Sequence, residues 1–222
     1  MGSRPGPTEL LVRCEAIGVT LPVVRRVAEA AEPIPLGGEI AGEVVAVGDA
    51  VSRFRAGDRV TGLCFGHGYA DFALLQEAMA SPVPDDADAV DAVALLRSGL
   101  VALGALTAAR PEPGEAALVT AAASGVGHLA VQLARTRGAI RVVGAVSDPA
   151  KAAFVRALGA DDILTYDQLP DRGDRVDYAL ERSAARCSRP PSRPWRPADG
   201  SWRTAPAEGR SRRTTCWWVP SP

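Results

Sequence analysis

The stretch 117–134 constrains the fold of this chain more than any other; it reads Ala-Leu-Val-Thr-Ala-Ala-Ala-Ser-Gly-Val-Gly-His-Leu-Ala-Val-Gln-Leu-Ala. Its first residues are mostly apolar and predict a short buried strand, small residues from Ala122 to Gly127 predict a tight turn, and apolar residues from Val126 onward recur at helical spacing. A strand, a tight turn and a helix open a βαβ unit whose helix N-terminus can bind a pyrophosphate. A tight strand–helix turn in another α/β protein could look the same, because Gly127 is the one glycine kept at the three-residue spacing.

The residues that follow favour the nucleotide-binding interpretation. Residues 141–146 predict a second buried strand, and Asp148-Pro149 predicts a helix start with aspartate as the N-cap and proline at the first helical position. Gly159 is suited to end that helix. Residues 163–166 and 176–180 predict two more strands. This alternation of strands and helices predicts a parallel, doubly wound sheet.

The first half of the chain has a different pattern. Short strands are predicted between glycine- and aspartate-containing turns, and a helix rich in alanine and leucine is predicted over 88–109. Closely spaced strands of this kind indicate a small all-β barrel in front of the α/β unit. The predicted strands cover 10–17, 42–48 and 69–75, and residues 56–62 are predicted to form a turn that feeds another strand.

Four motifs occur in order along the chain: Gly38-Glu-Ile-Ala-Gly-Glu-Val-Val-Ala-Val-Gly48, Phe54-Arg-Ala-Gly-Asp-Arg-Val-Thr-Gly62, Gly68-Tyr-Ala-Asp-Phe72 and 121–134. Together they resemble the medium-chain dehydrogenase/reductase superfamily, and within it the zinc-independent quinone oxidoreductase and enoyl reductase branch, over about residues 9 to 181. The resemblance implies an α/β fold, with a GroES-like β-barrel domain that carries the substrate site and a partial Rossmann doubly wound parallel sheet. It also implies an oxidoreductase that transfers a hydride from NADPH to a small-molecule quinone or α,β-unsaturated carbonyl.

The chain departs from zinc-dependent relatives, which carry His-Glu where this sequence has Gly38-Glu39. Cys64 and His67 lie three residues apart, but the sequence has only two histidines and no further ligand cluster, so no metal site is expected. The branch commonly has asparagine where this chain has Thr20, which either lies at the active site or is a plain polar turn residue.

The turn and its surroundings supply the candidate cofactor-binding residues. The backbone of the turn is expected to hold the pyrophosphate. Asp148 lies near the distance at which NAD-binding proteins place an acidic residue on the ribose, which favours NADH. If Asp148 instead caps the helix, Ser147 and Lys151 can bind the 2′-phosphate of NADPH, which favours NADPH. The resemblance implies that Tyr166 also lines the 2′-phosphate pocket. The candidates are therefore Ala123, Ser124, Gly125, Val126, Gly127, Ser147, Lys151 and Tyr166.

No catalytic residue is predicted. Hydride transfer depends chiefly on holding donor and acceptor in line, and water can supply the proton. Tyr69 could donate a proton, but its place in an alternating strand pattern favours a structural role.

Composition narrows the class of protein. The formal net charge is −1, so no basic field favours nucleic acid or an anionic membrane surface. No apolar run approaches the ~20 residues that span a bilayer, and no signal peptide is expected, so the expected location is the cytoplasm. Four cysteines without CxxC spacing do not form a disulfide framework.

The two ends differ from the family pattern. We expect an N-terminally incomplete GroES-like domain over 1–92, an incomplete Rossmann domain over 93–181 and an unstructured tail over 182–222. The tail has nine Arg, seven Pro and all four Trp, and neither helical nor alternating periodicity, so no strand is expected in it. A shifted reading frame near Arg182 would explain this composition; a natural arginine- and tryptophan-rich tail that binds a partner is the alternative.

A half-sheet would leave the strand that begins at Ala117 with an uncovered edge, which predicts poor solubility, weak NADPH binding and little turnover. Two functions therefore remain open: an NADPH-dependent reductase, or a non-catalytic remnant that at most binds a nucleotide. Relatives often pair through the Rossmann edge, so a homodimer is expected only if the sheet is complete.

Overall fold

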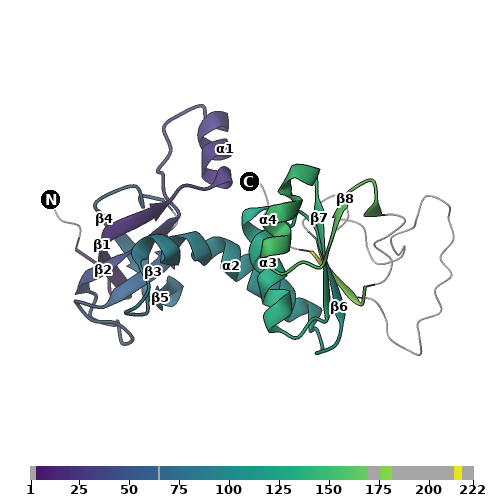
Figure 1. The fold of residues 1–222 in the computed structure, drawn as a ribbon. Coiled ribbons are helices and arrows are strands. Elements are labelled where there is room, and N and C mark those ends of the chain that lie inside the picture. The colour runs from purple at the N-terminus through teal and green to yellow at the C-terminus, as the bar shows by residue number, and fades with distance from the viewer. Residues whose placement is uncertain (1–3, 65, 170–175, 182–212, 217–222) are drawn as a thin grey trace. The chain divides into compact units, whose positions relative to one another are not determined.

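The computed structural model describes residues 4–64, 66–169, 176–181 and 213–216 (Figure 1). The chain divides into two compact units, Met1–Arg97 and Ser98–Pro222. The sequence had suggested a division between residues 92 and 93.

The first unit is built on a five-stranded antiparallel sheet with the order β4-β1-β2-β3-β5. Because β4 and β5 lie at opposite ends of this order, the hydrogen-bonded ladder of the described strands does not close on itself. The inward side chains form one buried cluster that includes Leu10, Ile40, Val60 and Leu75. The strands are β1 (Glu9–Gly18), β2 (Glu39–Val47), β3 (Arg59–Leu63), β4 (Phe72–Gln76) and β5 (Ala80–Pro82), and a 3-10 turn, η1 (Glu77–Met79), joins the last two. Each strand predicted in this half is present.

The sequence pattern did not predict helix α1 (Leu21–Glu29), which follows β1. It begins with a proline in its first turn and has no buried residue. Its apolar residues Leu21, Val24 and Val27 recur at helical spacing but are exposed, so the segment was missed although its pattern is helical.

Helix α2 (Ala89–Ala109) matches the helix predicted over 88–109. Among the described residues it is the one helix long and apolar enough to span a membrane by length and composition, with a mean hydropathy of 1.7. Asp91 and Arg97 interrupt the apolar run of this helix, so the sequence holds no unbroken apolar run of that length although the helix as a whole is apolar. Ala102, Ala105 and Leu106 are buried in the core of the second unit, as in the core helix of a globular protein.

The second unit contains a parallel sheet with the order β10-β9-β6-β7-β8. Its strands are β6 (Ala116–Val119), β7 (Arg141–Val146), β8 (Asp162–Thr165), β9 (Tyr178–Glu181) and β10 (Arg213–Cys216). Helical segments among the described residues between these strands are α3 (Gly125–Thr136), η2 (Pro149–Lys151) and α4 (Ala152–Ala157). The predicted strand–helix alternation over 117–180 is confirmed.

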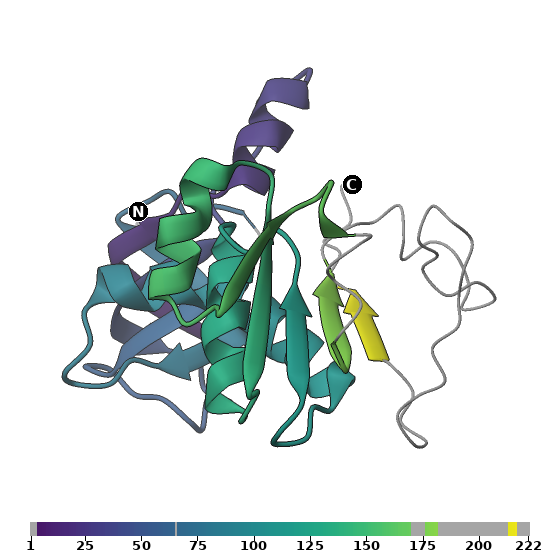
Figure 2. The same cartoon turned by 45° about the vertical axis from the view of Figure 1, so that its right-hand side comes forward.

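Alternate residues of β7 face two apolar clusters. Val142 and Val146 pack with the buried residues of α2, α3 and α4, while Val143 and Ala145 pack with Leu164 on the other side of the sheet. Figure 1 shows α3 and α4 on the same side of the sheet as the C-terminal half of α2, and Figure 2 shows the strands side by side.

Two expectations about this sheet were wrong. Strand β6 is paired with β9 on one edge and β7 on the other, so neither of its edges is uncovered. Strand β10 lies within the segment in which no strand was expected, and it pairs with β9 in parallel. Backbone pairing requires no side-chain periodicity, so the composition of the segment could not exclude a short strand. The rest of the proposed tail lies outside the described residues.

Candidate functional site

Backbone hydrogen bonds fix the turn between β6 and α3 against the sheet. Ala121 has a left-handed φ of 49°, a conformation that is uncommon for any residue but glycine. Its carbonyl oxygen accepts the Ser124 amide at 2.8 Å, and the Ala122 amide donates to Ala145 on β7 at 2.9 Å. These contacts attach the turn to the carboxyl end of the sheet, where nucleotides bind in parallel α/β folds.

Gly127 allows the helix to begin close to the turn. A Cβ at this position would lie 2.8 Å from the Ala121 carbonyl carbon and 2.9 Å from the Ala122 Cα, closer than side chains approach backbone atoms. Gly125 is different: it is exposed, and the nearest atom to an added Cβ is Ser98 Oγ at 3.1 Å. The turn therefore requires glycine for packing at 127 and is open to solvent at 125.

Ser124 caps α3, since its hydroxyl oxygen accepts the Gly127 amide at 3.1 Å. The His128 amide donates to the Ser124 carbonyl at 2.9 Å. Within the described part of the chain, the amides of Gly125 and Val126 have no acceptor, as is usual for the first turn of a helix. Two N–H groups at the positive end of the α3 dipole are thus available to an anion.

Tyr166 lies immediately after β8 and reaches this turn. Its hydroxyl oxygen accepts the Ala121 amide at 2.8 Å, although 45 residues separate the two positions. The side chain is 44% exposed. The tyrosine therefore contacts the nucleotide turn directly, a contact that the sequence did not reveal.

Ser147 and Lys151 lie on the loop and 3-10 turn after β7, and both are exposed. Asp148 between them caps η2, since its carboxylate accepts the Ala150 amide at 2.9 Å. The capping role predicted from Asp148-Pro149 is confirmed, and Gly159 ends the following helix with a left-handed φ of 105°.

Ala123 to Gly127, together with Tyr166, thus lie around a single turn, whereas Ser147 and Lys151 lie at the end of the neighbouring strand. The backbone of this turn fits a dinucleotide. The amides of Gly125 and Val126 are free, Gly125 is exposed, and a side chain at Gly127 would collide with the backbone of the turn. When bound, such a cofactor would supply a hydride from its nicotinamide ring.

The candidate residues of the first unit lie apart from this turn in the sequence. Thr20 is partly buried, and its hydroxyl has no hydrogen-bond partner. The Tyr69 hydroxyl donates to the Gly18 carbonyl at 3.3 Å, which gives this side chain a structural contact. Cys64 is buried, while His67 is exposed on a left-handed loop residue with φ 60°.

Burial raises the pKa of the Cys64 thiol, which keeps it protonated at neutral pH. Over the ranges that the structure describes, no group of three or more His, Cys, Asp or Glu side chains could hold a metal ion.

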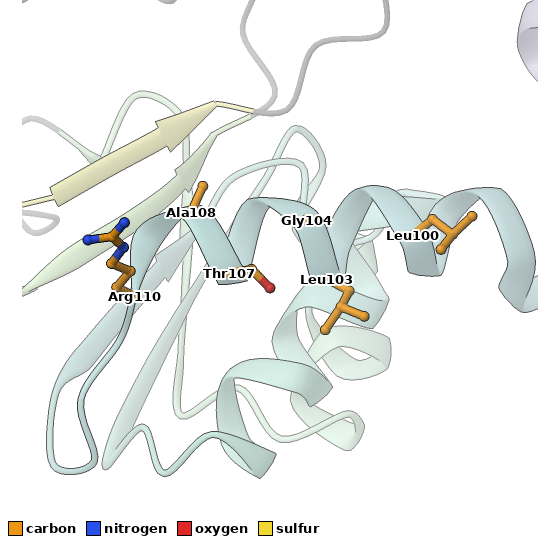
Figure 3. A pocket seen from close by; sticks show the side chains of 6 residues that line it. All are labelled: Leu100, Leu103, Gly104, Thr107, Ala108 and Arg110. Atoms are coloured by element: carbon orange, nitrogen blue, oxygen red, sulfur yellow. The ribbon is translucent and has the colours of Figure 1, made fainter.

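A shallow hollow lies on the C-terminal half of α2, and Figure 3 shows the side chains that line it. It is lined by Leu100, Leu103, Gly104, Thr107, Ala108 and Arg110. This surface is largely apolar, and it brings together no pair of groups suited to acid–base or hydride chemistry. The hollow is therefore not the candidate site.

Two family models match the chain. The alcohol dehydrogenase GroES-like domain matches residues 6–85, and the zinc-binding dehydrogenase model matches residues 125–186. The chain belongs to the medium-chain dehydrogenase/reductase superfamily. Quinone oxidoreductases and an enoyl reductase among its relatives place it in the quinone oxidoreductase and enoyl reductase-like branch of that superfamily, as its motifs predicted.

Individual relatives agree with this assignment. A quinone oxidoreductase of Pseudomonas aeruginosa is 38% identical over 170 residues, which cover 74% of this chain and 52% of the relative. The quinone oxidoreductase of Thermus thermophilus, solved alone and with NADPH, superposes with a TM-score of 0.68 at 30% identity and covers 82% of this chain and 60% of that chain. The enoyl reductase CurK gives a TM-score of 0.70 at 27% identity, over 82% of this chain and 61% of that chain. This chain thus spans about half to three fifths of the length of these relatives.

Proposed function

We propose that the chain binds NADPH at the β6–α3 turn and takes part in hydride transfer to a quinone or an α,β-unsaturated carbonyl compound. The observation that carries the proposal is the pair of acceptor-free amides, Gly125 and Val126, above the packing glycine Gly127. In this proposal the two amides donate to pyrophosphate oxygens. The likeness to a quinone oxidoreductase solved with NADPH supports it.

The choice of NADPH over NADH rests on the end of β7. The Asp148 carboxylate already accepts the Ala150 amide, while the Ser147 hydroxyl and the Lys151 ammonium group are exposed. A hydroxyl and a cation suit a 2′-phosphate, and charge-assisted contacts of this kind contribute about 1.5–3 kcal/mol. The proposed location is the cytoplasm, and the proposed partner is a small-molecule acceptor.

Titration with NADPH and NADH, followed by nicotinamide fluorescence, tests the proposal. We expect Lys151→Met to weaken NADPH binding about 10–100-fold and to leave NADH binding unchanged, because about 1.4 kcal/mol corresponds to a factor of ten. Arg156→Met is the matched control, since Arg156 is an exposed cation on α4. Equal losses for both cofactors, or no binding to the wild-type chain, would refute the assignment.

A second candidate function is nucleotide binding without turnover. It requires only the free amides of the β6–α3 turn, which can bind an anion without a chemical step. Oxidation of NADPH in the presence of 1,4-benzoquinone separates the two: a reductase consumes NADPH in proportion to the quinone, whereas a chain that only binds nucleotide does not.

A further inference from the structure

The first unit contains a buried ion pair that no role described above requires. Glu39 lies on β2 and is 1% exposed, and its Oε1 accepts a hydrogen bond from Nε of Arg97 on α2. The Arg97 side chain is 29% exposed. Because an isolated buried carboxylate is strongly unfavourable, the guanidinium group is held in place by the charge it neutralises.

Gly38 makes room for the guanidinium group. A Cβ at Gly38 would lie 2.8 Å from Arg97 Nη2 and 3.9 Å from the Cys64 carbonyl oxygen. The arginine therefore occupies the space that a side chain at position 38 would fill, beside the segment that ends in Cys64.

Both members of this ion pair have unused hydrogen-bonding capacity. Among the described residues, the two terminal nitrogens of Arg97 donate to no acceptor. Glu39 Oε2 is buried without a partner and lies 3.3 Å from the position of a Cβ on Gly18. Buried polar groups of native proteins are nearly always paired, so this capacity points to a ligand or water that completes it.

The charges of Glu39 and Arg97 limit the chemical class of ligand that can bind beside them. Glu39 already neutralises Arg97, and its second oxygen would repel a carboxylate or phosphate. A neutral carbonyl oxygen avoids this repulsion and can still accept the free N–H groups. The surroundings are apolar as well, since Val93 Cγ1 lies 3.1 Å from the same Cβ position on Gly18.

We propose that the terminal N–H groups of Arg97 bind the carbonyl oxygen of the acceptor and that Glu39 fixes the guanidinium group in the orientation this requires. The inference rests on the proposed reductase function, and it assigns the acceptor-binding donor to this cluster. A guanidinium group is planar and permanently charged, and its paired N–H donors are suited to bind an oxygen that becomes negative during a reaction.

The chemistry balances without a metal ion. In an α,β-unsaturated carbonyl, the hydride adds to the β-carbon, the carbon–carbon π pair moves toward the carbonyl, and the oxygen becomes an enolate while NADPH is oxidised to NADP⁺. Arg97 donates to this oxygen as it gains charge. A proton from water then adds to the α-carbon and restores the carbonyl group.

An enal chromophore tests the contact without any cofactor. The absorption of 4-(dimethylamino)cinnamaldehyde moves to the red when its carbonyl oxygen accepts a hydrogen bond. We expect the wild-type chain to produce this shift, and Arg97→Met to abolish it and to weaken binding of the aldehyde about 10-fold. Arg13→Met is the matched control, because Arg13 is a partly exposed arginine of the same unit with a single ion pair, to Glu43 at 2.6 Å.

Removing Arg97 alone leaves a buried carboxylate unpaired and can unfold the unit. The double variant Glu39→Gln/Arg97→Met avoids that charge, and we expect it also to lose the red shift. Absence of the shift in the wild type, or its survival in the double variant, overturns the inference. If NADPH fails to bind but the shift behaves as expected, the proposed function fails while the acceptor site remains.

Should NADPH be oxidised, the same variants separate positioning from general damage. We expect Arg97→Met to lower kcat about 100-fold with the KM for NADPH unchanged, a loss typical of removing one oxyanion donor. Arg97→Lys should retain part of the wild-type kcat, since lysine keeps the positive charge but lacks the paired N–H donors of a guanidinium group. Equal changes in every parameter would indicate a merely structural ion pair.

Discussion

Alanine at the two glycines of the β6–α3 turn should separate packing from binding. Gly127 and Gly125 both belong to α3, but an added methyl group at Gly127 meets the backbone of Ala121 and Ala122 at 2.9 Å or less, whereas at Gly125 the nearest atom is Ser98 Oγ at 3.1 Å. The same substitution therefore tests two different properties of one turn.

The expected free energies follow from these contacts. Overpacking against fixed backbone costs about 1–3 kcal/mol, and replacing glycine by alanine inside a helix returns about 1 kcal/mol. Because the contacted atoms belong to the backbone and cannot move aside, the upper end of this cost applies, and Gly127→Ala should lower the free energy of unfolding by about 2 kcal/mol. Gly125→Ala should change it by less than about 0.5 kcal/mol, as exposed substitutions do. Its methyl group stands beside the two free amides, so it should weaken NADPH binding at least about 10-fold.

Urea unfolding and nicotinamide fluorescence measure the two quantities separately. The reasoning is refuted if Gly127→Ala is as stable as the wild type, or if Gly125→Ala binds NADPH with unchanged affinity. Ala152→Gly is a useful control, because it alters helix propensity in α4, away from the turn.

Three further outcomes are expected. Tyr166→Phe removes the acceptor of the Ala121 amide, so hydrogen exchange at this amide should accelerate and stability should fall by about 0.5–1.5 kcal/mol; an unchanged exchange rate would contradict the contact. Burial, with the charge of Cys64 and Asp71, raises the pKa of Cys14 to about 11; iodoacetamide should therefore modify Cys14 at pH 8 about 100-fold more slowly than a thiol of ordinary pKa. Partial burial opposes ionisation of Asp161, but the Val142 amide and Arg135 hold its pKa below the usual value. The stability it contributes is present above the ordinary aspartate pKa and is lost as pH falls through the lowered one. The difference between wild type and Asp161→Asn, expected to be below about 1 kcal/mol at pH 7, should therefore shrink as pH falls below the ordinary aspartate pKa.

Local patterns in the sequence predicted much of this fold. The Asp148-Pro149 pair located a helix start, and short apolar runs between turns located the strands of both units. These features depend on neighbours along the chain, which is the information that a sequence pattern holds.

Apart from helix α1, what the sequence missed are contacts between distant residues. Tyr166 and Ala121 are separated by 45 positions, and Arg97 and Glu39 by 58. Neither pair has a spacing that a local rule could recognise. Strand β10 was missed for the same reason, since its pairing with β9 is a property of the assembled sheet.

The place of β6 in the middle of its sheet has a consequence for how the second unit comes apart. Local opening begins at outer strands, which have one neighbour, and reaches inner strands last. Residues 213–216 and 162–165 form those outer strands, while β6 is held on both sides. Strand β6, which precedes the small-residue turn, is therefore expected to open last. Partial denaturation would separate β10 and β8 from the sheet before it disturbs the anion-binding amides at the start of α3.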